Sequence, residues 1–241
     1  MKTNFVKGFF LQALLFIWLS QLAIITFAQG DTVMVKYSPD FKFKEGIYLN
    51  FNQVKNNSPI SGARILANKD YRDDDFFDEV LNKDYISFFD NLGMRQQVQT
   101  KNIWGFSRNG VLYININGGF NRVTIVGNIC HFVATVTTYN TRYNDPYYNN
   151  PYYSPYYNPY SNPYSMGSSS YETSEMRQFI LDFNTGKVMD YDYKNLEMIL
   201  MQDPELHDEF SNLRKRKKKQ LKFLYIRKFN ERNPLYLPVK E

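Results

Sequence analysis

Between residues 102 and 138 the chain alternates short apolar runs with turns that contain Asn and Gly. The runs are rich in β-branched and aromatic side chains, which favour strands, and a two-residue Asn-Gly step is a strong local signal for a hairpin. The turns fall at Asn109-Gly110, at residues 117–119 and at Gly127-Asn128. The pattern therefore predicts a four-stranded antiparallel meander, which we take as the folded core.

Six further segments have the alternating or β-branched pattern of strands. Two pairs of them flank a short turn, Asn91-Leu92-Gly93 in one case and Asn184-Thr185-Gly186 in the other, and each pair predicts a hairpin. The six segments are residues 32–37, 64–67, 85–90, 94–98, 176–183 and 187–191.

Helix signals occur at three places outside this β-rich pattern. Asn50 is placed to cap a single helical turn that runs to Lys55. Asn195 is placed to cap a short helix, whose inward side chains would be Leu196, Ile199 and Leu200.

A longer helix is predicted after Asp203, which is a good capping residue and is followed by Pro204 at the first helical position. Its apolar residues recur at steps of three and four, apart from one gap at Lys217, whose methylene stem can still cover apolar surface. The helix should end near Asn230, because Asn233-Pro234 cannot continue it. The apolar stripe consists of Leu206, Phe210, Leu213, Leu221, Leu224 and Tyr225.

Together these elements predict an α+β fold that is mainly antiparallel β, a meander or open barrel of hairpins, with C-terminal helices. The 241 residues suffice for one such domain. We divide the chain into a leader (1–28), the first part of the β-rich domain (29–138), a Tyr/Pro/Asn-rich segment (139–174), the final hairpin of the same domain (175–193), the C-terminal helices (194–232) and a tail (233–241).

The Tyr/Pro/Asn-rich segment differs in composition from the sequence on either side. Pro-Tyr recurs in it every four or five residues and aliphatic side chains are nearly absent, so it cannot form a core of its own. We expect a disordered, partly polyproline-like loop between two strands. The functional alternative is a glycan-binding module, in which the tyrosine rings form a stacking surface, or a tether.

The first 28 residues have the layout of a secretory signal peptide. Lys2 and Lys7 precede an almost uncharged apolar run, and small residues end it at Ala28. Cleavage after Ala28 would export the protein to the periplasm, the outer-membrane surface or the extracellular space. The alternative is an uncleaved membrane anchor, because the run is long enough to span a bilayer.

Cys130 is the one cysteine of the chain, so no internal disulfide can form. It lies within a predicted strand of the meander. We therefore expect a small buried hydrophobic side chain and not a reactive thiol.

Several motifs resemble those of uncharacterised exported proteins of the Bacteroidota. The first is a Gly-Ile-Tyr-Leu segment that leads into Val-Lys-Asn-Asn-x-Pro, at residues 46–49 and 54–59. Further matching segments are residues 104–106, 181–187 and 225–234. The resemblance covers most of the chain after the leader, apart from the Tyr-rich segment. It implies a location in the cell envelope and does not imply any particular activity.

Charge is distributed unevenly along the chain. The whole chain has a net charge of +5, whereas residues 211–241 hold eleven Lys/Arg and two Glu, which is +9. Without Lys2 and Lys7 of the leader, residues 29–210 therefore carry about −6. Six consecutive cations stand out as the candidate site: Arg214, Lys215, Arg216, Lys217, Lys218 and Lys219.

This basic run predicts either a solvated face of a helix or an anion-binding site. Six successive cations point to all sides of a helix, so part of the run should protrude from the body. In an exported protein the candidate partners are anionic lipid, anionic glycan or an acidic envelope protein, including a second copy of the chain. Nucleic acid is not expected after a signal peptide.

No motif for catalysis, phosphate binding or zinc binding occurs, and the two histidines, His131 and His207, are far apart in sequence. Residues 73–79 are rich in acids but lack the spacing of a calcium loop, so we expect a solvated acidic loop or helix start. We therefore predict no cofactor, no metal and a non-enzymatic envelope protein. The alternative is a hydrolase that uses an acidic pair such as Asp190 and Asp192.

Overall fold

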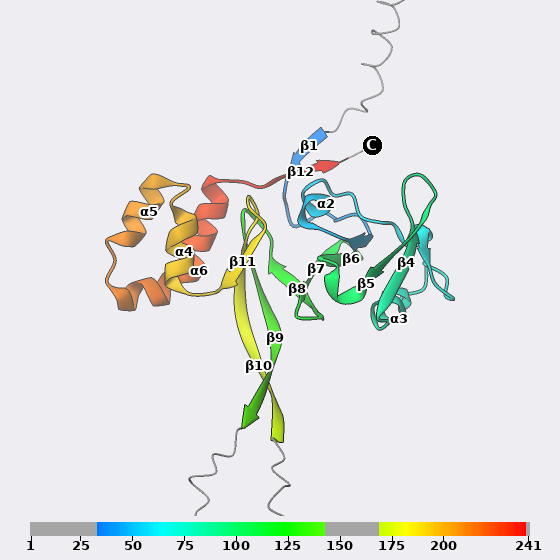
Figure 1. Cartoon of the computed structure of the whole chain (residues 1–241). Coiled ribbons are helices and arrows are strands. Elements are labelled where there is room, and N and C mark those ends of the chain that lie inside the picture. The colour runs from blue at the N-terminus through cyan, green and yellow to red at the C-terminus, as the bar shows by residue number, and fades with distance from the viewer. Residues whose placement is uncertain (1–32, 143–168, 240–241) are drawn as a thin grey trace, which may run out of the picture.

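The computed structural model describes residues 33–142 and 169–239. The predicted signal peptide and most of the Tyr/Pro/Asn-rich segment lie outside these residues. The fold is α+β with mostly antiparallel strands, as predicted, and its largest element is a seven-stranded sheet curled into a half-barrel, in the order β11-β10-β9-β8-β7-β6-β2 (Figure 1). Its strands are β2 (Gly46–Tyr48), β6 (Gly105–Arg108), β7 (Val111–Ile116), β8 (Gly119–Ile125), β9 (Ile129–Arg142), β10 (Ser169–Asp182) and β11 (Lys187–Asp190).

The predicted meander is confirmed as β6 to β9, which pair antiparallel in chain order. Two of its turns have a positive φ at both central residues, 53° and 77° at Asn109-Gly110 and 53° and 89° at Asn117-Gly118. Backbone of this kind matches the right-handed twist of the flanking strands, and Asn and Gly adopt it at low cost. The Asn-Gly signals in the sequence therefore set the register of the sheet.

A smaller sheet, in the order β3-β4-β5, packs beside the half-barrel (Figure 1). Its strands confirm the predicted short strand and the predicted hairpin around Asn91-Leu92-Gly93. Helix α3 covers a hydrophobic cluster that this sheet shares with the main sheet. The bounds are β3 (Ile65–Leu66), β4 (Tyr85–Phe89), β5 (Arg95–Gln99) and α3 (Phe76–Leu81), with short 3-10 turns at Gly62–Arg64 and Thr100–Asn102.

The predicted tail contains a strand. Strand β12 (Tyr236–Val239) pairs antiparallel with the predicted first strand, β1 (Val33–Lys36), from Val33 opposite Val239 to Lys36 opposite Tyr236. The two strands form a separate ribbon above the half-barrel (Figure 1). Pro238 cannot donate to a ladder, and a short segment with proline is typical of such an edge strand.

The loop boundaries at residues 139 and 174 were wrong. Strands β9 and β10 pair over fourteen residues each, from Ile129 opposite Asp182 to Arg142 opposite Ser169. Residues 139–142 and 169–174 therefore belong to strands, because the register of the hairpin continues without a bulge beyond the apolar part of the sequence. Together β9 and β10 form an arm that extends beyond the rest of the molecule (Figure 1).

Two of the three helix caps were predicted correctly. The side chain of Asn50 accepts a hydrogen bond from the Gln53 amide at the start of α2 (Phe51–Lys55). The cap of α4 (Tyr193–Leu200) was wrong, because Asp192 and not Asn195 is its N-cap residue. The Asp192 carboxylate accepts a hydrogen bond from the Asn195 amide at 2.8 Å.

The single long helix predicted after Asp203 is two helices, α5 (Pro204–Ser211) and α6 (Lys215–Arg232). Asp203 caps α5 as predicted, and Pro204 is in its first turn. The chain turns at residues 212–214, where the Asn212 amide donates to the Asp208 carbonyl, and α6 returns across α5 and α4. The turn brings Tyr225, Ile226 and Phe229 of α6 into one core with Leu206 and Phe210 of α5. A straight helix would have left these side chains in water.

The interior of the half-barrel is lined by apolar side chains of β7 to β10, including Leu112, Phe132 and Leu181. Cys130 belongs to this cluster and is fully buried, which confirms its predicted place. Burial raises the pKa of its thiol to about 12, so the nucleophilic thiolate is not formed at neutral pH.

Candidate functional site

The basic run forms the start of α6. Arg214 is the N-cap residue and makes no side-chain capping bond, and residues 215–219 occupy the first turns. Helix α6 begins at the outer end of the helical group and runs toward β12 (Figure 1). The side chains of the run are exposed, with the exception of the half-buried Lys218.

Some cations of α6 are used to hold the helices together. Lys218 lies 2.6 Å from Glu197 of α4, and the two side chains are only 12% and 22% exposed. Lys228 lies 2.6 Å from Glu209 of α5. Arg232 contacts Asp203 at 2.9 Å and Glu205 at 2.5 Å. The inner face of α6 therefore pairs its cations with the acids of α4 and α5.

The prediction for Lys217 was wrong by one residue, because Lys218 fills the gap in the apolar stripe and Lys217 is exposed. The Lys218 ammonium also lies 5.7 Å from the centroid of the Phe210 ring. Leu224 is not part of the stripe, since 45% of its surface is exposed. The side chain at the gap position points toward α4 and α5. A lysine is tolerated there because its methylene stem covers apolar surface while its ammonium pairs with a carboxylate.

A set of cations on α6 and at its cap is exposed and has no ion pair within residues 33–142 and 169–239. It contains five members of the predicted run and one cation that the sequence reading missed, Arg227. We call this set the free cations: Arg214, Lys215, Arg216, Lys217, Lys219 and Arg227.

The free cations at the start of α6 oppose helix formation. The N-terminus of a helix carries a partial positive charge, so acids are favourable there, but α6 has no acid in its first turn. Each unfavourable charge costs about 0.3–1 kcal/mol at low salt, and the like-charged pair Lys215 and Lys219 adds to this cost. Folding of α6 therefore does not explain why these cations are present.

Two large apolar side chains are exposed among the cations. Phe223 and Leu224 lie in the middle of α6 and are 46% and 45% exposed. The Phe223 ring packs against His131 of β9 and against Tyr191, with ring centroids 4.7 and 4.8 Å apart, and the remainder of its surface is exposed. Exposed apolar side chains among cations can enter the boundary between the head groups and the acyl chains of a membrane.

Asn230 fixes α6 to the start of β9. Its side-chain oxygen accepts a hydrogen bond from the Ile129 amide at 2.8 Å, and its side-chain nitrogen donates to the Ile129 carbonyl at 2.9 Å. The Asn230 side chain therefore makes the pair of hydrogen bonds to the Ile129 backbone that a neighbouring strand would otherwise make. Gly127 makes the contact possible, because a Cβ atom there would lie 2.4 Å from the Asn230 side chain.

His131 lies in a buried aromatic setting between β9 and α6. Its Nε2 is 3.2 Å from Gln178 Oε1, and its ring forms T-shaped contacts with the rings of Tyr191 and Phe223. Lys222 lies nearby and donates a hydrogen bond to the Tyr191 carbonyl at 2.8 Å. Burial, with a smaller contribution from the charge of Lys222, lowers the pKa of His131. The neutral ring is therefore the stable form in the folded protein.

Acidification below pH ~6.5 should destabilise the protein through His131. The unfolded chain takes up a proton near the ordinary pKa of about 6.5, whereas the folded state resists protonation, so stability is lost as the pH falls from there through the lowered pKa. Each pKa unit contributes about 1.4 kcal/mol. The melting temperature of His131→Phe should decline less than that of the unchanged protein between pH ~7 and ~5. A His207→Phe control should keep the full decline. Equal declines in all three proteins would contradict the assignment.

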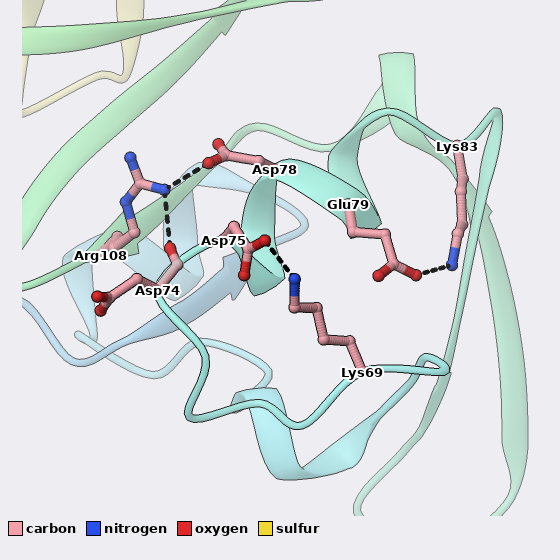
Figure 2. Close-up of polar contacts among 7 residues, drawn as sticks. All are labelled: Lys69, Asp74, Asp75, Asp78, Glu79, Lys83 and Arg108. Carbon is pink, nitrogen blue, oxygen red and sulfur yellow. Dashed lines mark hydrogen bonds and ion pairs between the residues drawn. The ribbon is translucent and has the colours of Figure 1, made fainter.

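The acidic segment at residues 73–79 forms the predicted loop and helix start, and ion pairs surround it. Figure 2 shows Lys69 against Asp75, Lys83 against Glu79, and Arg108 against Asp78 and the Asp74 carbonyl. Three separate cations thus pair with three of the five carboxylates, those of Asp75, Asp78 and Glu79. Within the described part of the chain, no group of three His, Cys, Asp or Glu residues is arranged to hold a metal ion.

The hydrolase alternative requires a pair of carboxylates in one groove, and four surface grooves bear on it. Each of them is lined by a single acid: Asp90, Glu231, Asp84 and Asp190. Asp192, the suggested partner of Asp190, is instead the capping residue of α4. None of these four grooves therefore offers the two facing carboxylates of a glycosidase.

The largest of the four grooves, of about 640 Å³, has five amide side chains in its lining beside apolar residues and the charged Arg64 and Asp90. Asn50, Gln53 and Asn56 line it from the α2 region, and Asn91 lines it from the β4–β5 turn. The Asn50 and Gln53 side chains already accept backbone hydrogen bonds, from Gln53 and Leu49. The groove can form hydrogen bonds with a neutral polar molecule.

Comparison of the chain with models of known protein families, with curated proteins and with solved structures gave no match. Among residues 33–142 and 169–239, none of the helices has the length and apolar character needed to cross a bilayer.

Proposed function

We propose that the protein is exported to the bacterial envelope and binds the anionic head groups of a lipid surface through α6. The observation that carries this proposal is the position of the free cations. Five of the six gather at the start of α6, where they oppose helix formation, and all six are exposed and have no acidic partner in the described residues. Binding to an external anion gives a reason for them that folding does not.

Phe223 and Leu224 favour a lipid surface over a soluble glycan or an acidic protein. Their exposed apolar surface gains free energy when it enters the boundary between head groups and acyl chains. Each cation near an anionic membrane adds about 1 kcal/mol. The free cations and the two apolar side chains thus supply an electrostatic and an apolar contribution to binding at a membrane surface.

The proposal is tested by reversing the four exposed lysines and arginines of the first helical turns, Lys215, Arg216, Lys217 and Lys219, to Glu. The protein from Gln29 onward should sediment with vesicles of phosphatidylglycerol and phosphatidylcholine at low salt but not with phosphatidylcholine alone. The variant should lose this binding. High salt should weaken binding of the unchanged protein, because the screening length falls from about 10 Å at 0.1 M to about 3 Å at 1 M.

A matched control separates position from net charge. Arg95, Lys101, Arg122 and Lys187 are exposed cations on other strands and turns, and reversing them changes the net charge by the same amount. This control should retain vesicle binding. The α6 variant should unfold no more easily than the unchanged protein, because acids are favourable at a helix start. Equal loss in both variants, or no vesicle binding of the unchanged protein at low salt, would reject the proposal.

The export half of the proposal rests on the leader and on the resemblance to exported proteins of the Bacteroidota. N-terminal sequencing of the protein recovered from the cell envelope should give a chain that begins at Gln29. A recovered chain that still begins at Met1 would support the uncleaved anchor.

A further inference from the structure

We propose that a groove beside α6 binds the single acyl chain of an anionic lipid. The groove has a volume of about 530 Å³, which is within the range of ligand pockets. It lies between the C-terminal half of α6, the turn from β8 to β9, and the two segments that lead from the β1–β12 ribbon to the rest of the chain.

The lining of the groove is mostly apolar. Gly127, Ile226 and Leu235 line it and are buried, whereas the ring of Phe223 is partly exposed to solvent. Half-buried side chains complete the apolar lining, namely Tyr37, Ile125, Val126 and Pro234. An alkyl chain that enters this space gains about 0.8 kcal/mol for each methylene it buries.

The charged side chains in the lining favour an anionic head group. Lys36 of β1 and Arg227 of α6 both line the groove, are exposed and have no ion pair within the described residues. Glu231 is the one acid in the lining, so the groove keeps a net positive charge. Asn230 also lines the groove, but its amide is already paired with the Ile129 backbone. A chain with a neutral head group would leave both cations unpaired.

The groove opens beside the proposed lipid-binding face. Arg216, Lys219, Phe223 and Arg227 follow one another at steps of three and four, so they share one side of α6. Phe223 and Arg227 belong both to this side and to the groove lining. A lipid whose head group meets the cations of α6 can therefore place an acyl chain in the groove. That the ligand is a lipid rests on the proposed function. That the groove holds its acyl chain rests on the apolar lining of the groove itself.

Matched soluble amphiphiles test the inference without a membrane. Binding of dodecyl phosphate, butyl phosphate and dodecyl maltoside to the protein from Gln29 onward is measured by calorimetry, below the critical micelle concentration of each. Dodecyl phosphate should bind about tenfold or more tightly than either of the others, because it alone has both the chain and the anionic head. Methyl NMR signals of Ile125 and Val126 should shift on binding. Equal affinity for butyl phosphate, or shifts confined to residues 214–219, would overturn the inference.

Two variants separate this site from the free cations at the start of α6. The double variant Lys36→Glu/Arg227→Glu should lose about tenfold or more in affinity for dodecyl phosphate and keep its melting temperature. The variant with Lys215, Arg216, Lys217 and Lys219 reversed should lose vesicle binding and keep dodecyl phosphate binding. Loss of dodecyl phosphate binding in the second variant alone would place the ligand on the basic run and overturn the groove. Retained vesicle binding in the second variant would instead reject the proposed function.

Discussion

Reversing Lys218 to Glu should lower the free energy of unfolding by about 3 kcal/mol. The Lys218 ammonium lies 2.6 Å from the Glu197 carboxylate, and the two side chains are only 12% and 22% exposed. A glutamate at this position would leave Glu197 without its cation and place a second negative charge against it. Breaking a largely buried ion pair by changing one partner is costly, because the remaining charge loses both water and its counter-charge. Urea unfolding followed by circular dichroism measures the change.

Lys217→Glu is the matched control, because it makes the same chemical change one residue earlier. Lys217 is exposed and has no ion pair within the described residues, and it lies in the first turn of α6, where an acid is favourable. The free energy of unfolding of the Lys217→Glu variant should be unchanged or higher by up to about 0.5 kcal/mol. A Lys218→Glu variant as stable as the Lys217→Glu control would mean that the whole basic run is solvated. Neighbouring lysines in one run would then have the same role, contrary to the structure.

Replacing Gly105 with Ala should destabilise the half-barrel by about 3 kcal/mol. A Cβ atom at Gly105 of β6 would lie 2.1 Å from the Tyr113 carbonyl oxygen of β7. That oxygen belongs to the backbone and cannot rotate away, so strands β6 and β7 must separate locally. The separation would disturb the contact between the Phe106 and Tyr113 rings, whose centroids are 4.6 Å apart.

Gly119→Ala provides the comparison on the same sheet. The nearest atom to a Cβ at Gly119 is the Ile116 carbonyl oxygen at 3.5 Å, which is ordinary van der Waals contact. Its effect should stay within about 0.5 kcal/mol, as for most surface substitutions. Thermal unfolding of the two variants checks the contrast. A Gly105→Ala variant that melts with the unchanged protein would show that β6 can move without cost.

Local signals in the sequence were sufficient for most of the strands and for part of the helical region. The Asn109-Gly110 turn, the Asn50 cap and the Asp203 cap each depend on contacts within a few residues, so they could be predicted correctly. The α4 cap failed for a local reason as well. Asp192 and Asn195 are both good capping residues three positions apart, and only the structure shows which side chain accepts the hydrogen bond.

The remaining errors concern contacts between distant parts of the chain. The break at residues 212–214 has no Gly or Pro, and it forms because α6 must return to the core of Leu206 and Phe210. The difference between Lys218 and the exposed cations of the basic run also depends on a distant contact, because Lys218 pairs with Glu197 of α4. Arg227 was missed because it lies outside the continuous run of cations, although it shares a side of α6 with Arg216.

The β1–β12 ribbon has a consequence for the order in which the chain can mature. Its strands are separated by about two hundred residues, so the ribbon closes late and slowly compared with the local hairpins. Until Tyr236 and Leu237 arrive, β1 has no partner, and Val33, Met34 and Val35 remain 40–56% exposed even after pairing. In a chain that crosses a membrane with its N-terminus first, this apolar edge would be in water throughout translocation. Such edges attract other chains, so a chain exported in the proposed way should need a holding chaperone until its final strand has emerged.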